Sequence, residues 1–283
     1  MFPQPIQRSS YFAQGSYRIM LYASIIIWLL PLAAVILLSI RSLADINSGN
    51  FYGWPNEFSL VKNYTEIFQL TPMLQYFFNS IIITIPTVIG TLTLSSLAGY
   101  ALAKYNFRGN FLIFALFIAG NFVPAQILMI PVRDLTLKFG IYDTKIGLIF
   151  FHTAFQTGFC TFFLRGFIKE LPHELVESAR IDGASEFRVF WKIIIPLVRP
   201  ALAALAVLEF TFIWNDYFWA LVLVQGDEAR PITLGIQALQ GRWTSFWHLV
   251  SAGSILAALP PVCLFFMLQK HFIAGLTLGA VKE

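Results

Sequence analysis

The residue types best suited to binding another protein lie in a charged stretch, 171–200, between two long apolar runs. Three acids precede one arginine and a turn of small residues: Glu170, Glu174, Glu177, Arg180 and Asp182-Gly183. Carboxylates pair with the arginines of a partner protein, and small residues let that partner approach closely. An amphipathic helix resting on lipid is the alternative, but such helices favour Lys and Arg on their polar face. We therefore expect a protein docking site here.

The spacing within this stretch predicts two short helices. Pro172 can begin the first, because its missing N–H would be unsatisfied there anyway. Asp182-Gly183 is typical of a helix end, where glycine accepts a left-handed conformation. Ser185 can cap the second helix, and Pro196 marks the return toward the next apolar run.

Catalytic and metal-binding patterns are missing from the sequence. The four histidines stand at unrelated positions, and no Ser-His-Asp pattern or metal-ligand spacing occurs. Cys160 and Cys263 fall within apolar runs, where buried, inert thiols are expected. The chain also lacks G-x-x-x-x-G-K-[ST], so it cannot cradle ATP in that way. We do not expect an enzyme, a metal site or a cofactor on this chain.

The composition indicates an integral membrane protein. Of 283 residues, 57% are hydrophobic and 12% are charged, and the mean hydropathy is +0.70. A soluble domain carries roughly a quarter charged residues. Several apolar runs approach or exceed about 18 residues, the length of a membrane-spanning helix. The net charge of +4 is spread along the chain and gives no reason to expect nucleic-acid binding.

Six transmembrane helices are predicted in a single domain, 1–283, without internal repeats. Their approximate bounds are 19–40, 76–103, 111–131, 144–167, 200–224 and 248–272. Pro31 should kink the first, and Pro260-Pro261 should break the last. With the N-terminus inside, twelve Lys and Arg residues lie in the cytoplasm and seven outside. Both termini and the 171–200 loop are then cytoplasmic, and 225–247 is an external loop.

The charged stretch resembles the EAA signature of ABC importer permeases. That signature is approximately E-A-A, three residues, G, nine residues, I-x-L-P. The residues in register are Glu177, Ala179, Gly183, Ile193 and Pro196. Ser178 stands where alanine is usual and Ile195 where leucine is usual, and both replacements keep the size or the apolar character. The sequences of residues 171–184 and of the tail 270–282 are similar to those of the carbohydrate branch of this family, in particular to the smaller permease of the maltose-type importers.

This resemblance implies a type I ABC importer permease in the cytoplasmic membrane of a bacterium or archaeon. Its partners would be a second permease chain, two ATPase subunits carrying ATP and Mg, and an external binding protein that delivers a sugar. The cytoplasmic helix would dock on an ATPase, with Glu177 pairing with a basic residue and Ala179 allowing close contact. Gly183 would make the tight turn, and Pro196 would begin the link to the fifth span. Ser178, Asp182 and Ile193 belong to the same segment.

Polar residues in the fifth predicted span are candidates for a substrate pathway. They are Glu209, Trp214, Asn215 and Asp216. An aromatic face with carboxylates or amides suits a sugar, but such residues can equally pack helices through interhelical hydrogen bonds. A secondary transporter could use Glu209 and Asp216 as ion sites, but it usually brings inverted repeats and leaves the EAA resemblance unexplained. The resemblance implies that loop 225–247 contacts the binding protein, with an ordinary solvated loop as the alternative.

Overall fold

The computed structural model describes residues 10–51, 53–240 and 246–278, with side chains to residue 269. Every regular element among them is a helix, and their only strand-like pairing is an isolated bridge between Arg41 and Phe58. This confirms the predicted all-α class. The described residues form two compact units: one runs to Thr71 and includes Ile236–Leu256, and the other comprises the rest. The single permease domain and the cytoplasmic termini stay predictions.

The first unit contains three helices of its own, α1 (Tyr11–Ser39), α2 (Leu43–Asn47) and α3 (Leu60–Leu70), and the start of α14 (Trp247–Leu278). Helix α1 begins at Ser10, whose Oγ accepts a hydrogen bond from the Ala13 N–H. None of the residues in its most apolar stretch is buried against the described residues. Such a surface suits lipid or another membrane helix, because it has no other apolar cover.

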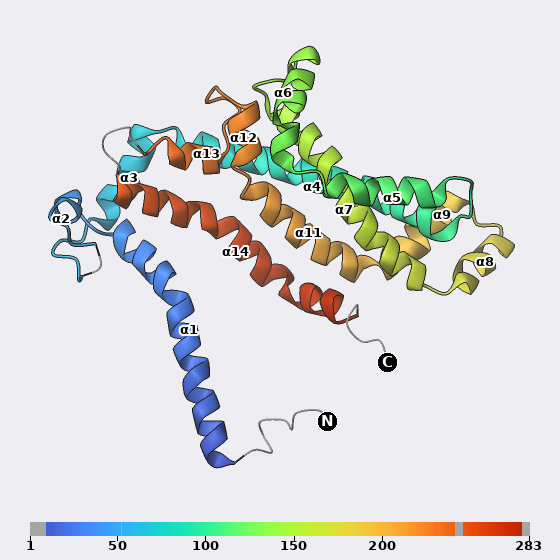
Figure 1. Ribbon diagram of the computed structural model, residues 1–283, viewed down its shortest axis with the longest axis horizontal. Helices are drawn as coiled ribbons and strands as arrows, with labels where there is room; N and C mark the ends of the chain where they lie inside the picture. Colours follow the sequence, from blue (N-terminus) through green and yellow to red (C-terminus); the bar gives the residue numbers. More distant parts are fainter. Residues whose placement is uncertain (1–9, 52, 241–245, 279–283) are drawn as a thin grey trace. The chain divides into compact units, whose positions relative to one another are not determined.

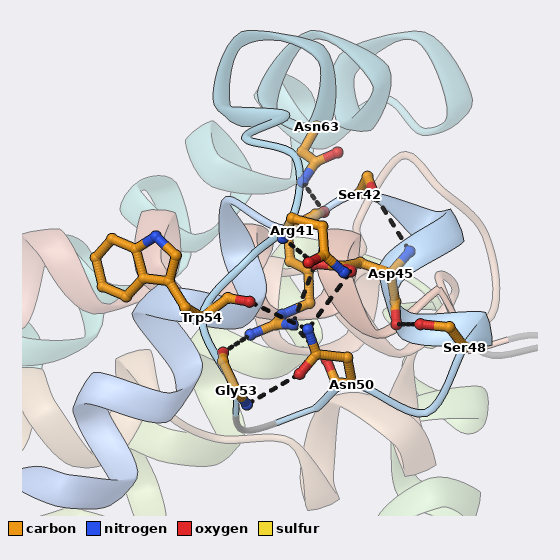
Figure 2. Close-up of polar contacts among 9 residues, drawn as sticks. Arg41, Ser42, Asp45, Ser48, Asn50, Gly53, Trp54 and Asn63 are labelled. Carbon is orange, nitrogen blue, oxygen red and sulfur yellow. Dashed lines mark hydrogen bonds and ion pairs between the residues drawn. The ribbon is translucent and has the colours of Figure 1, made fainter.

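A buried arginine organises the turn that follows α1 (Figure 2). Arg41 is fully buried and pairs with Asp45, with 3.2 Å between Nη1 and Oδ2. Its guanidinium also donates to the carbonyls of Asn50 and Gly53. Asn63 of α3 closes the turn by donating to the Arg41 carbonyl at 2.8 Å. The buried charge is therefore paired and hydrogen-bonded, the condition under which burial is tolerated.

Asp45 is held in its ionised form by the same turn. Burial raises the pKa of Asp45, but hydrogen bonds from Asn56 and Asn50 and the charge of Arg41 together lower it below its ordinary value. Its carboxylate accepts from the Asn56 N–H at 2.9 Å, so the stretch before α3 is tied back to α2.

The second unit is built on two long helices that lie side by side, α4 (Met73–Lys104) and α7 (Lys145–Glu170) (Figure 1). Helix α5 (Asn110–Asn121) packs on α7, and α11 (Arg199–Trp214) packs on both α4 and α7. Gly99 permits α4 to approach the α7 backbone closely: a Cβ there would lie 3.2 Å from the Arg165 backbone nitrogen and 3.3 Å from Leu164 Cβ. Small residues allow membrane helices to pack this closely.

The third predicted span is bent in the structure, and a second bend, of 75°, lies just before the fifth, between Glu186–Leu197 and α11. Within the described part of the chain, four helices are long and apolar enough to cross a membrane, α1, α4, α7 and α14, and up to six spans result if each bent pair counts as one. The predicted continuous span 111–131 is wrong: α5 ends at Asn121, and η2 (Ala125–Leu128) with α6 (Met129–Lys138) leaves at 93°. Pro124 explains the bend, because the residue before a proline avoids the helical conformation.

The fifth and sixth predicted spans also need correction. Helix α11 ends at Trp214, and a separate helix, α12 (Phe218–Leu223), follows, so 200–224 is not one helix. Helix α14 continues through Pro260-Pro261, so the predicted break is absent. Membrane helices tolerate proline because neighbouring groups satisfy the freed backbone. The short α13 (Ile232–Gln237) lies in the predicted external loop.

Candidate functional site

The predicted docking stretch forms helix α8 (His173–Ile181), which begins directly after Pro172. Val176 and Ala179 are buried, whereas Glu174, Glu177 and Ser178 are exposed. The helix therefore turns a narrow apolar stripe toward the rest of the chain and an acidic face outward. This confirms the helix start expected from the sequence.

Gly183 ends α8 in a left-handed conformation with φ of +78°. The Ala184 N–H donates to the Ala179 carbonyl at 2.9 Å, and the Gly183 N–H donates to the Arg180 carbonyl at 3.0 Å. This pair of bonds is the Schellman arrangement that glycine favours. Nothing lies within 4 Å of a Cβ built on Gly183, so the glycine borders open space rather than the chain's own atoms. The adjacent Asp182 is also exposed.

The second predicted helix is present and continues with a wide turn. Ser185 caps α9 (Glu186–Val189) by accepting from the Arg188 N–H at 3.4 Å. A π-helical turn, η3 (Phe190–Ile194), and α10 (Ile195–Leu197) then lead to α11. Pro196 gives the physical reason: its missing N–H cannot bond to the carbonyl four residues earlier, and its ring crowds that carbonyl. The Ile195 N–H bonds instead to the Phe190 carbonyl.

A buried cluster joins this loop to the long helices. Its members come from α4, α7, α8, the α9–α10 segment and α11: Tyr100, Cys160, Leu164, Ile168, Val176, Ala179, Val189, Phe190, Ile194, Val198, Ala201 and Leu205. Ile193 packs against it. Ala179 and Ile193 thus hold the loop to its own chain. The side chain of Ala179 faces inward, and not outward where a partner would dock. Glu177, Ser178, Asp182 and Gly183 provide the outer surface, and Pro196 is half-buried.

Two pathway candidates, Glu209 and Trp214, are fully enclosed by the second unit. Glu209 has no exposed surface, and its Oε1 accepts a hydrogen bond from Cys160 Sγ at 3.1 Å. Its Oε2 has no hydrogen-bond partner among the described residues. Trp214 is 1% exposed, donates from Nε1 to the Ala257 carbonyl at 2.8 Å and stacks on Phe210. Both side chains join helices in this conformation.

The Asp216 side chain hydrogen-bonds to the first turn of α12. Its carboxylate accepts from the backbone N–H groups of Trp219 at 3.2 Å and Ala220 at 3.0 Å. His152 of α7 lies 3.3 Å from the same carboxylate. Asn215 is the exposed member of the four candidates, and its amide donates to the Thr211 carbonyl. Trp214, Asn215 and Asp216 therefore do not form one open sugar-binding face here.

Of the predicted external loop, the structure describes residues 225–240 and 246–247, and residues 241–245 fall outside the described residues. The part up to Gly235 belongs to the second unit and is bonded to it. Asp143, in a left-handed conformation, accepts from the N–H groups of Gln225 and Gly226 at 2.8 and 2.9 Å. Tyr76 donates to Asp227 at 2.7 Å, and Arg230 pairs with the same carboxylate. This segment is an anchored structure and not a free loop. No sequence motif signals Asp143 or Tyr76.

Comparison with known proteins places the chain in a family. The family model described as "Binding-protein-dependent transport system inner membrane component" matches residues 92–277, which include the docking loop and the external loop. The chain belongs to this family. It is therefore a multi-pass membrane component of a transport system, which agrees with the apolar helices described above.

Similar proteins include permeases of named uptake systems, two of which are named for sugars. The chain is 34% identical to the osmoprotective compounds uptake permease protein GgtD of Synechocystis, over 91% of the chain and 88% of GgtD. It is also 34% identical to the melibiose/raffinose/stachyose import permease protein MelC of Bacillus subtilis, over 89% and 91%. The arabinooligosaccharides permease protein AraQ of Bacillus subtilis is 34% identical, with 78% of each chain covered.

The fold is that of a solved importer. A chain in the crystal structure of a bacterial ABC transporter involved in import of the acidic polysaccharide alginate superposes with a TM-score of 0.82. The match covers 96% of this chain and 100% of that one, at 23% identity. This confirms the expected ABC importer permease fold.

Proposed function

We propose that this chain is a permease subunit that moves a carbohydrate or sugar derivative into the cell by alternating access. ATP hydrolysis would occur on two separate ATPase subunits that hold ATP and Mg, and this chain would carry no catalytic group. A second permease chain would complete the pore, and an external binding protein would deliver the sugar. The sugar class is supported by relatives whose names specify sugar uptake, MelC and AraQ.

The observation that carries the proposal is the construction of α8. Its acidic outer face ends at a glycine-capped turn that borders open space, while its inner stripe is packed into the cluster shared with α4, α7 and α11. Protein interiors are close-packed and transmit displacement. A partner that grips the outer face can therefore move the long helices, which is what coupling to an ATPase requires.

Purification of the tagged chain from its own cells in mild detergent tests the assembly. We expect an ATPase subunit and a second permease in stoichiometric amounts by quantitative mass spectrometry. A Glu177→Arg variant should lose the ATPase and keep the second permease, because it reverses the charge on the docking face. Asp134→Arg, the same charge reversal at an exposed acid of α6, is the matched control. Recovery of the chain alone or as a homodimer would favour a secondary carrier.

The substrate class is tested through the external binding protein that restores substrate uptake by the assembled importer. Thermal shift against sugars, polyols, amino acids and peptides should give stabilisation by a sugar or polyol only, since a ligand stabilises the protein it binds by mass action. Stabilisation by an amino acid or peptide would remove the carbohydrate assignment and leave the ATP-driven importer intact.

A further inference from the structure

Glu186 joins three segments at the cytoplasmic loop. Its Oε1 accepts from Arg180 Nε at 2.6 Å, and its Oε2 accepts from the hydroxyls of Tyr100, at 3.0 Å, and Tyr105. Arg180 belongs to the last turn of α8, Tyr100 to the last turns of α4, and Tyr105 directly follows α4. The carboxylate thus connects the α8–α9 turn to the end of α4.

The connection has one buried end and one exposed end. Tyr100 is 5% exposed and packs edge-on against Tyr105, with 5.6 Å between ring centroids. The side chains of Arg180 and Glu186 are 39% and 47% exposed. The Arg180 guanidinium also lies over the Tyr105 ring, 5.6 Å from its centroid. An exposed ion pair alone contributes little, but charge-assisted bonds from tyrosines anchored in a core are stronger and hold a defined geometry.

Local helix formation does not account for the placement of Glu186. Ser185 already caps α9 with its side chain, and an acid in the first turn needs only proximity to the helix dipole. The Glu186 carboxylate instead points across the turn to residues 81 and 86 positions earlier in the chain. This placement serves the contact between the loop and α4.

The covalent route from α8 explains why such a contact matters. The chain runs from α8 through α9, η3 and α10 into α11, so displacement of α8 reaches α11 directly. It reaches α4 only through side chains. Lys104, at the end of α4, bonds to the segment just before α8 by donating to the Leu171 carbonyl at 2.6 Å. Glu186 connects the segment just after α8 to the same end of α4.

We propose that Glu186 is a positioning residue for coupling: it clamps the turn after α8 to the end of α4, so that a displacement of α8 moves α4 together with α11. This inference rests on the proposed docking of an ATPase on α8. The EAA resemblance does not include position 186, so the role is additional to that motif.

The test uses the complete importer in proteoliposomes, with uptake and ATP hydrolysis measured on the same preparation. In Glu186→Ala, sugar taken up per ATP hydrolysed should fall roughly five- to thirtyfold, the change that corresponds to lost interactions worth about 1–2 kcal/mol. Glu186→Gln should lose less, because its amide oxygen still accepts from the tyrosines. Asp134→Asn, at an exposed acid of α6, is the control and should leave the ratio unchanged.

A double-mutant cycle separates coupling from simple stability. Tyr105→Phe removes one donor and should lower the same ratio, and Tyr105→Phe combined with Glu186→Ala should be no worse than Glu186→Ala alone. If complex yield, hydrolysis and uptake fall together at a constant ratio, Glu186 only stabilises the loop and the proposal is overturned. Additive losses in the ratio also overturn it. Failure of the wild-type chain to assemble with an ATPase would instead overturn the proposed function.

Discussion

Substitutions at Gly183 separate the two reasons for having glycine at the end of α8. The first reason is backbone conformation: φ is +78°, and an ordinary L-residue in the left-handed region costs about 1–2 kcal/mol. Asparagine and aspartate enter this region more readily than alanine. The second reason is space for a partner. No atom of the described residues lies within 4 Å of a Cβ at this position, so we attribute any steric penalty beyond backbone strain to another protein.

The two reasons predict opposite rankings. If strain dominates, Gly183→Ala should transport less than the wild type by the roughly 5- to 30-fold that 1–2 kcal/mol represents, and Gly183→Asn should lose less than Gly183→Ala. If docking dominates, the larger asparagine should transport less than alanine although it strains the turn less. We expect the second ranking. Gly183→Asp, which has the size of asparagine, should insert normally and abolish transport.

The assay is initial sugar uptake in cells that lack the native copy, normalised to the amount of each variant in the membrane. Thermal stability of the purified complex reports the strain separately, and Asp134→Asn, at an exposed acid of α6, serves as the control. Full uptake by Gly183→Asn and Gly183→Asp at normal membrane levels would refute the coupling role of Gly183. Lower uptake by alanine than by asparagine would refute the steric argument and leave only the backbone requirement.

Other residues give three further predictions. Trp214→Phe loses the hydrogen bond to the Ala257 carbonyl. It should therefore lower the stability of the complex by about 1 kcal/mol, the typical contribution of one hydrogen bond, and leave the KM for sugar unchanged. A raised KM at unchanged stability would place Trp214 on the pathway. Asp216→Ala should destabilise the complex by about 1 kcal/mol through the lost cap, whereas Asp216→Asn should retain most of it; equal rises in KM for both variants would contradict this role and indicate contact with substrate. The pKa of Asp45 is lowered from its ordinary value of 3.8. The stability that its hydrogen bonds provide should therefore be complete above that pH and be lost as the pH falls below it. Amide protection factors of residues 41–59 that stay constant on acidification would contradict this prediction.

Local signals in the sequence predicted the docking loop well. Pro172, Gly183 and Ser185 each determine a helix boundary through their own backbone or side-chain chemistry, and the structure has all three boundaries. The EAA spacing located the loop for the same reason, because its glycine and proline act on the nearest residues.

Features that depend on distant residues were not predictable in this way. Glu186 meets Tyr100 and Tyr105 only after α4 and α9 have come together. Asp216 is an apparent intramembrane acid in the sequence, and only the folded chain shows that its carboxylate accepts from the α12 backbone and lies beside His152. Hydropathy also cannot distinguish a straight span from a bent one, so the 93° bend after Asn121 was missed.

The hydrogen bonds made by polar side chains in and after α11 limit how far this subunit can select between sugars. Glu209 bonds to Cys160, Trp214 bonds to a backbone carbonyl, and Asp216 caps a helix. Each is engaged within the second unit, and reorienting any one of them to hold a sugar would leave a buried polar partner without its hydrogen bond, which is costly. Asn215 is the candidate that remains exposed. We therefore expect this subunit to provide few of the hydrogen bonds that distinguish one sugar from another, and expect selection to reside largely in the external binding protein and the second permease.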